Sequence, residues 1–134
     1  MKCSDLKIGQ SYEMQRSFSE LEIKAFADLS GDTNPIHTDA DFAKSSRFGR
    51  LIVPGFLTAS LFSAIIGTKF PGIGSIYLNQ NMVFLKPVFL NQVVTATVSV
   101  KELYPEKNRV LLETVCCDEN GEKLIDGTAL VKLS

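Results

Sequence analysis

The chain has 134 residues, with 14 Lys and Arg against 15 Asp and Glu, a net charge of −1 and 45% hydrophobic residues. This length predicts a single domain over residues 1–134, and the hydrophobic content excludes a mainly disordered chain. The balanced charge argues against nucleic-acid binding, and the single histidine excludes metal sites and chemistry that need two imidazole groups.

The three cysteines indicate a reducing compartment. Cys116 and Cys117 are neighbours, so in a strand their side chains point to opposite faces, and Cys3 stands alone. Such a set is a poor disulfide framework, and it contains no Cys-x-x-Cys pair for zinc or redox chemistry. Residues 1–5 carry no apolar segment typical of a secretion signal. We therefore expect a protein of the cytoplasm or an organelle matrix.

The first third of the chain predicts a strand, a helix and a loop. Residues 11–18 favour a short strand, and a helix is expected to begin at Ser19. Ser19 and Glu22 match the capping box, in which each side chain bonds the backbone amide of the other residue. Residues 30–38 are rich in Gly, Asp, Asn and Pro, which predicts a loop, and a short helix is expected at 39–46.

An uncharged segment follows at residues 51–68. A membrane span needs about 20 predominantly apolar residues, and this shorter segment is interrupted by Pro, Gly, Ser and Thr. Pro54 stands where a helix can start and Gly67 where one can stop. We predict a helix at 55–67 that is buried inside the domain, because it is apolar on nearly every side.

The remaining chain predicts an antiparallel sheet. Strands are expected at residues 73–85, 93–103, 109–117 and 123–133, and Asn120-Gly121 predicts a hairpin between the last two. The second strand alternates apolar and polar residues, as expected when only one face is buried. The predicted fold is α+β, with an antiparallel curved meander wrapped around one long buried helix.

Two features of the sequence predict chemistry. Asp32 precedes the only histidine, His37, by five residues, and Pro35 stiffens the loop because it forces Asn34 into an extended conformation. An imidazole exchanges a proton near neutral pH, so the two side chains can form an acid/base pair around one water. The alternative is a solvent-exposed turn, for which the same residue types are typical.

The second feature is the start of the apolar helix. There the Gly55 amide and the helix dipole favour a negatively charged oxygen. The alternative is that Pro and Gly serve only to start the helix.

Residues 26–37 contain the motif Gly-Asp-x-Asn-Pro-hydrophobic-His. This motif resembles the hydratase motif of the R-specific enoyl-CoA hydratases, which are MaoC-like dehydratases of the hot-dog fold. The resemblance extends over residues 8–133 and includes the segments 48–55, 71–78 and 84–88. It implies one MaoC-like hot-dog domain and a hydro-lyase of fatty acid metabolism, including the supply of polyhydroxyalkanoate precursors.

The resemblance also implies residue roles. Asp32 and His37 would hold the water that adds to a trans-2-enoyl-CoA, giving an R-3-hydroxyacyl-CoA. Asn34 would brace the loop, and the Gly55 amide would hold the thioester oxygen. No cofactor is implied beyond the coenzyme A that the substrate carries, and no metal. The chain departs from many members at Pro54, where they carry His.

The family places its acyl tunnel along the apolar helix. This implies substrate contacts for Phe62, Ser63 and Ile66, although the aromatic and aliphatic residues equally suit a core. The basic residues Lys44, Arg47 and Arg50 can meet the phosphates of coenzyme A, or they can form an ordinary solvated surface.

Two other functions remain open from the sequence, and a third is disfavoured. The first is a 3-hydroxyacyl-[acyl-carrier-protein] dehydratase of fatty acid synthesis, and the second is a non-catalytic acyl-thioester binding module. A hot-dog thioesterase is disfavoured because no Asp or Glu occurs between Leu51 and Lys101. In each case we expect a homodimer or higher homo-oligomer with no nucleic-acid or membrane partner, because unpaired sheet edges favour self-association.

Overall fold

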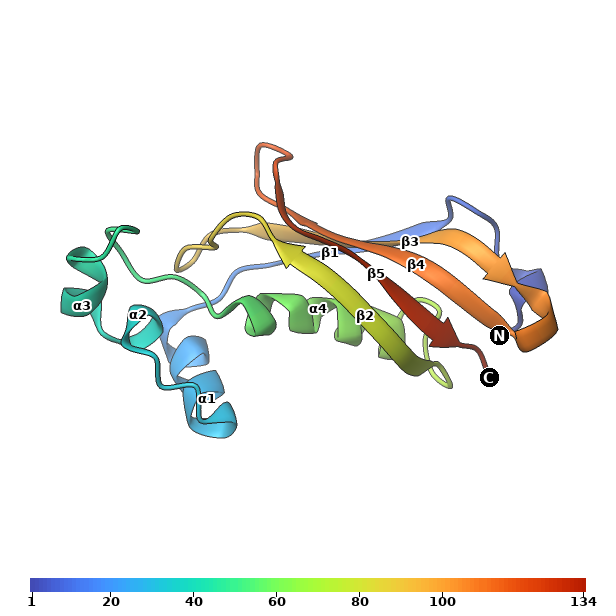
Figure 1. Ribbon diagram of the computed structural model, residues 1–134, viewed down its shortest axis with the longest axis horizontal. Coiled ribbons are helices and arrows are strands. Elements are labelled where there is room, and N and C mark those ends of the chain that lie inside the picture. The colour runs from blue at the N-terminus through green and yellow to red at the C-terminus, as the bar shows by residue number, and fades with distance from the viewer.

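The computed structural model describes all 134 residues, Met1–Ser134. A five-stranded antiparallel sheet curves over one side of the long helix α4, and three short helices gather at one end (Figure 1). The helical elements are η1 (Cys3–Asp5), α1 (Glu20–Ser30), α2 (Pro35–Thr38), α3 (Ala40–Lys44), α4 (Gly55–Thr68) and η2 (Pro105–Lys107). The strands are β1 (Ser11–Arg16), β2 (Ile76–Phe84), β3 (Val94–Tyr104), β4 (Arg109–Cys117) and β5 (Lys123–Lys132). This confirms the predicted α+β class and the curved antiparallel sheet.

The strand order is β1-β3-β4-β5-β2, with every neighbouring pair antiparallel. Strands β3, β4 and β5 form the predicted meander, but the expectation that β2 belongs to it is wrong. The segment 85–93 crosses over the end of the sheet, so β2 lies at the far edge and pairs with β5 rather than with β3 (Figure 1). Because β2 has only one neighbour, its other edge is free.

The core lies between the sheet and helix α4. The apolar residues of β3 predicted to share one face are all buried, from Val94 to Val100. Phe62, Ile65 and Ile66 of α4 belong to the same cluster and are at most 1% exposed. Since burying one such side chain contributes roughly 1.5–3 kcal/mol, this face of the helix fixes α4 against the sheet.

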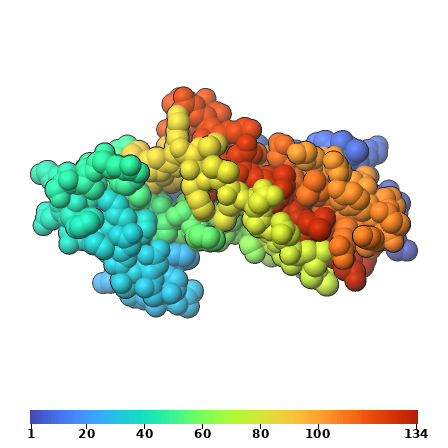
Figure 2. All heavy atoms as spheres, viewed as in Figure 1, coloured from blue at the N-terminus to red at the C-terminus, as the bar shows by residue number.

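Helix α4 is not buried on all sides, contrary to the prediction. Phe56, Ser60, Ser63 and Gly67 are exposed and recur at helical spacing, so they form one open face of the helix. Figure 2 shows green atoms of α4 at the surface between the lobe of α1–α3 and the strand β2. The reason is geometric, because five strands curve over only one side of the helix.

The segment after β1 follows the predicted capping chemistry. Ser19 Oγ accepts a hydrogen bond from the Glu22 amide at 3.2 Å, and Glu22 Oε1 accepts one from the Ser19 amide at 3.0 Å. Gly31 then ends helix α1 in the left-handed conformation, with φ of +81°. The predicted start and end signals of this helix are therefore both used.

The predicted loop at 30–38 contains a helical turn, α2 (Pro35–Thr38). Asn34 Oδ1 accepts a hydrogen bond from the Ile36 amide at 3.2 Å, and Pro35 takes the first helical position, which its ring favours. The next helix, α3, is shorter than predicted and begins after Asp39, which caps it. The turn matters because it fixes the backbone of His37.

The hairpin between β4 and β5 is confirmed. Its loop closes through the Asp118 carboxylate, which accepts hydrogen bonds from the Asn120 and Glu122 amides, both at 2.9 Å. Of the Asn120-Gly121 pair, only Gly121 takes a positive φ, of +80°.

All three cysteines are free. No helix is long and apolar enough to cross a bilayer.

Candidate active site

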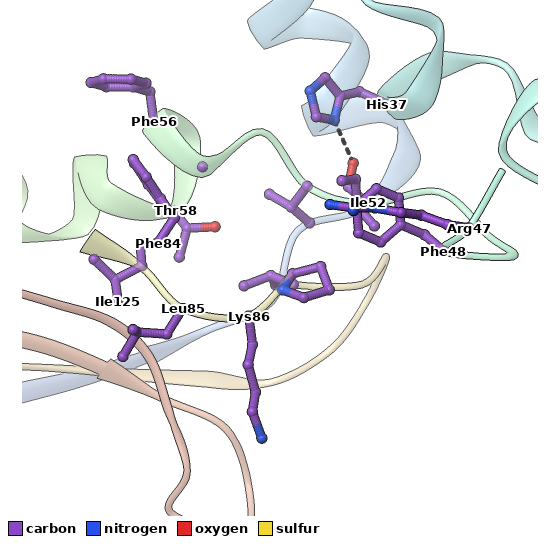
Figure 3. Close-up of a pocket in the computed structure, with 14 residues that line it drawn as sticks. His37, Arg47, Phe48, Ile52, Phe56, Thr58, Phe84, Leu85, Lys86 and Ile125 are labelled. Atoms are coloured by element: carbon purple, nitrogen blue, oxygen red, sulfur yellow. Dashed lines mark hydrogen bonds between the residues drawn. The ribbon is translucent and has the colours of Figure 1, made fainter. Parts of the chain in front are cut away.

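A pocket of about 380 Å³ lies where helix α4 begins. Its walls come from α2, the segment before α4, the first turn of α4, and the end of β2 with the residues that follow it (Figure 3). His37, Arg47, Thr58 and Lys86 are its polar and charged lining residues, and no Asp or Glu lines it. Nowhere in the structure do three or more His, Cys, Asp or Glu side chains gather as a metal site would require.

His37 is 8% exposed and is held in one orientation by the pocket's own backbone. Its Nδ1 lies 2.8 Å from the carbonyl oxygen of Ile52 (Figure 3). A carbonyl oxygen only accepts, so Nδ1 carries the proton and donates it, and we infer that Nε2 of the neutral ring is the free acceptor. The Ile52 amide in turn donates to Ile36 at 3.3 Å. The imidazole is therefore arranged to take a proton at Nε2.

Asp32 lies beside this pocket rather than in its wall. Its carboxylate accepts a hydrogen bond from the Asn34 amide at 3.4 Å, and its amide donates to Ser30 Oγ at 3.1 Å. Asp32 is partly exposed, and Asn34 is exposed and caps α2. Neither residue lines the pocket, and neither side chain bonds to the His37 ring, although the His37 amide donates to the Asn34 carbonyl at 3.1 Å. Asp32, Asn34 and His37 nonetheless lie within six consecutive residues of the chain.

Gly55 is the first residue of α4 and lines the same pocket as His37. Its N–H group finds no acceptor within the chain, as expected for the first amide of a helix. A Cβ at this position would lie 2.6 Å from Cε1 of Phe84. Only glycine fits there without displacing the Phe84 ring, which packs at 5.7 Å from the ring of Phe56. The amide and the imidazole are thus brought together by the fold.

The three residues implied for acyl binding are placed apart from this pocket. Phe62 and Ile66 lie in the core against the sheet, whereas Ser63 lies on the open face of α4. None of the three lines the pocket of the single chain. Residues four apart share a helix face, which is why Phe62 and Ile66 are buried together and the neighbouring Ser63 is not.

Thr58 is a pocket residue that the sequence reasoning missed. Its Oγ1 is buried without a hydrogen-bond partner, and in Figure 3 the hydroxyl points into the pocket. By contrast, Ser60 and Thr68 of the same helix donate to carbonyl oxygens of the preceding turn, at 2.5 and 2.6 Å. Thr58 stands three residues after Gly55, so helical spacing was the available signal for placing the two on one face.

Replacing Thr58 by valine should raise the free energy of unfolding by about 1 kcal/mol, because an isosteric methyl group removes a buried hydroxyl that has no partner. Urea denaturation of the two proteins measures the difference. Thr68→Val is the matched control and should give no gain, since the Thr68 hydroxyl is exposed and already bonded. A clear loss of stability in Thr58→Val would mean that the hydroxyl has a bonding partner.

Comparisons with known proteins agree on one family. The family described as "MaoC like domain" matches residues 5–117. The chain is 44% identical to the (R)-specific enoyl-CoA hydratase of Rhodospirillum rubrum over 127 residues, which is 95% of this chain and 88% of that protein. It is 37% identical over 130 residues to a mitochondrial 3-hydroxyacyl-[acyl-carrier-protein] dehydratase of Solanum lycopersicum, covering 96% of this chain and 78% of that protein.

The solved structure of an (R)-hydratase from Aeromonas caviae, described as involved in PHA biosynthesis, matches with a TM-score of 0.94 and 43% identity. The match covers 96% of this chain and 98% of that one. The sequence and structure comparisons therefore indicate the same family over nearly the full length of the chain. The chain belongs to the R-specific enoyl-CoA hydratase family of MaoC-like hydro-lyases, which have the hot-dog fold.

Proposed function

We propose that this protein hydrates trans-2-enoyl-CoA thioesters to (R)-3-hydroxyacyl-CoA, reversibly. The observation that carries the proposal is one pocket that holds an oriented imidazole and an unpaired helix-start amide, His37 and Gly55. The first is suited to accept a proton from water, and the second to stabilise an oxygen that becomes negative. The names of the hydratase relatives support the same reaction.

The proposed reaction uses only water and groups of this chain, with no cofactor. The Gly55 N–H donates to the thioester oxygen, which makes carbon 3 of the enoyl group electrophilic. Nε2 of His37 takes a proton from water while the water oxygen bonds to carbon 3, and the π electrons move onto the thioester oxygen. A proton then returns from the His37–Asp32 pair to carbon 2 of the enolate.

In this proposal Asp32 holds the second hydrogen of the water from the side of the pocket. Asn34 braces the turn by capping α2, which carries His37. The R configuration of the product is taken from the family and not from the geometry of the pocket. Pro54 donates no hydrogen bond to the substrate, because its ring nitrogen carries no proton.

Loss of the ultraviolet absorbance of crotonyl-CoA on addition of the purified protein tests the activity. Chiral analysis of the 3-hydroxybutyryl product then tests the stereochemistry, with the R isomer expected. An unchanged absorbance, or formation of the S isomer, contradicts the proposal.

The second candidate is dehydration of a 3-hydroxyacyl group carried on acyl carrier protein. The 37% identity to the 3-hydroxyacyl-[acyl-carrier-protein] dehydratase of Solanum lycopersicum favours this second candidate. Both reactions run through the same equilibrium and the same pocket groups, so the two differ only in carrier. The ratio of kcat/KM for crotonyl-CoA and for crotonyl-acyl carrier protein distinguishes them.

We further propose that the active form is a two-fold homodimer. Strand β2 has a free edge, with exposed Ile76, Leu78 and Val83, and the open face of α4 carries Phe56, which is 68% exposed. A second copy pairing at this edge covers both surfaces. In that assembly Ser63 faces the partner, where we propose it borders the acyl chain, with Phe62 and Ile66 behind it in the core.

Dilution should remove the activity together with the dimer, because the apolar surfaces beside the pocket are then returned to water. We expect specific activity towards crotonyl-CoA to fall over the same concentration range in which sedimentation shows dissociation. A stable 14.7 kDa monomer with full specific activity at every concentration contradicts this proposal.

A further inference from the structure

Positive charge is concentrated in the part of the chain that builds the pocket. Residues 42–101 contain six Lys and Arg and no Asp or Glu, although the whole chain has a net charge of −1. This segment supplies every pocket-lining residue except His37 and Ile125. The acidic groups therefore lie elsewhere in the chain, and the pocket wall carries cations without carboxylates.

Arg47 is the cation of this wall that no carboxylate neutralises. The ion pairs of the structure are Arg16–Glu22, Lys86–Glu122 and Lys123–Asp126, and Arg47 takes part in none of them. Lys86 also lines the pocket, but Glu122 bonds to it and raises the pKa of its ammonium group through that hydrogen bond and its charge. In Figure 3 the Lys86 chain extends away from Arg47.

An aromatic ring supports the guanidinium of Arg47. Its central carbon lies 4.9 Å from the centre of the half-buried Phe48 ring, and Figure 3 shows the group reaching over that ring towards Ile52. A guanidinium laid on a ring keeps its N–H groups free at the edges. Arg50 of the same segment, also without a carboxylate partner, is stacked over Phe89 at 3.7 Å.

We propose that Arg47 binds a phosphate group of the substrate's carrier, at the outer end of the pocket that holds His37 and Gly55. The planar fork of guanidinium donors matches phosphate oxygens, and an unpaired cation on a ring is already positioned for them. The inference rests on the proposed function, because a thioester carried on coenzyme A or on phosphopantetheine brings phosphates at a distance from its reacting carbons.

Three thioesters with the same acyl group and pantetheine arm test the proposal: crotonyl-CoA, which carries the phosphates and the nucleotide, crotonyl-4′-phosphopantetheine, which carries one phosphate, and crotonyl-pantetheine, which carries none. Arg47→Gln should raise KM for crotonyl-CoA about tenfold, the size of one lost charge-assisted hydrogen bond, with kcat unchanged. KM for crotonyl-pantetheine should not change. Arg16→Gln is the matched control, since Arg16 is also exposed and stacked on a ring but pairs with Glu22 outside the pocket.

The result with crotonyl-4′-phosphopantetheine identifies which phosphate is bound. If Arg47→Gln raises KM for crotonyl-4′-phosphopantetheine as much as for crotonyl-CoA, the phosphate is the one next to the pantetheine arm, common to both carriers. If only crotonyl-CoA is affected, the phosphates belong to its nucleotide. An equal loss with all three thioesters, or no loss with any, overturns the proposal.

Calorimetric titration of free coenzyme A and of pantetheine separates this inference from the proposed function. The wild-type protein should bind coenzyme A more tightly than pantetheine, and Arg47→Gln should reduce that difference about tenfold, whether or not any thioester is hydrated. A wild-type protein that hydrates none of the thioesters contradicts the proposed function alone. Equal binding of coenzyme A and pantetheine by the wild-type protein overturns the role of Arg47.

Discussion

His37→Ala is expected to lower kcat for crotonyl-CoA by about 100- to 10,000-fold, the usual effect of removing a positioned acid or base. The loss of kcat in Asp32→Asn should fall in the same range, because the amide keeps the shape of the side chain but cannot accept a proton. The reason for both losses is that Nε2 of His37 is the free acceptor of the pocket, and Asp32 is the carboxylate on the same turn of chain. Steady-state rates with crotonyl-CoA measure both effects.

The double variant should lose little more kcat than either single variant, since the two groups act together on one water. Far-ultraviolet circular dichroism and thermal unfolding serve as the control, and both variants should keep the wild-type secondary structure. Near-normal kcat in both single variants would show that the proposed acid/base pair is wrong. A double loss equal to the product of the single losses would show that the two residues act independently.

Gly127→Ala is expected to lower the free energy of unfolding by about 3 kcal/mol, the upper range for forcing extra volume into a packed interior. An added Cβ would lie 2.0 Å from the carbonyl oxygen of Asn81 and 2.8 Å from the Cα of Met82. Both are backbone atoms of β2, so relief requires β2 to move away from β5. Since β2 carries Phe84, which packs over Gly55, activity should fall with stability.

Denaturant unfolding measures this change, with Gly67→Ala as the control. Gly67 lies near the end of α4, and in the single chain nothing lies within 4 Å of an added Cβ, so alanine there should stabilise the monomer by about 0.5–1 kcal/mol. A Gly127→Ala protein as stable as the wild type would mean that β2 and β5 separate without loss, contrary to the close pairing described for them.

The features that the sequence predicted well are those set by neighbours in the chain. The capping box of Ser19 and Glu22 formed as expected, because both partners lie within one turn of helix. The alternation in β3 was readable because one of its faces is buried and the other meets water. The start of α4 was equally local, since Pro54 and Gly55 are adjacent to an uninterrupted apolar segment.

Local patterns failed where a segment's partner lies far along the chain. The far-edge position of β2 depends on its pairing with β5, and no residue within β2 specifies that choice. The turn Pro35–Thr38 was hidden because Asn, Asp, Pro and Gly suit a loop as well as a capped helical turn. The open face of α4 was missed because its small residues Ser60, Ser63 and Gly67 are compatible with burial as well as with exposure.

The sequence by itself determined the fold class, the family resemblance and which residues are able to transfer a proton. Only the tertiary structure decided that His37 donates from Nδ1 to the Ile52 carbonyl and so presents Nε2. It alone decided that Thr58 lacks a partner and that Arg47 is unpaired. The physical reason is that residue type and spacing specify which groups are available, whereas hydrogen bonds, burial and ion pairs depend on which distant segments pack together.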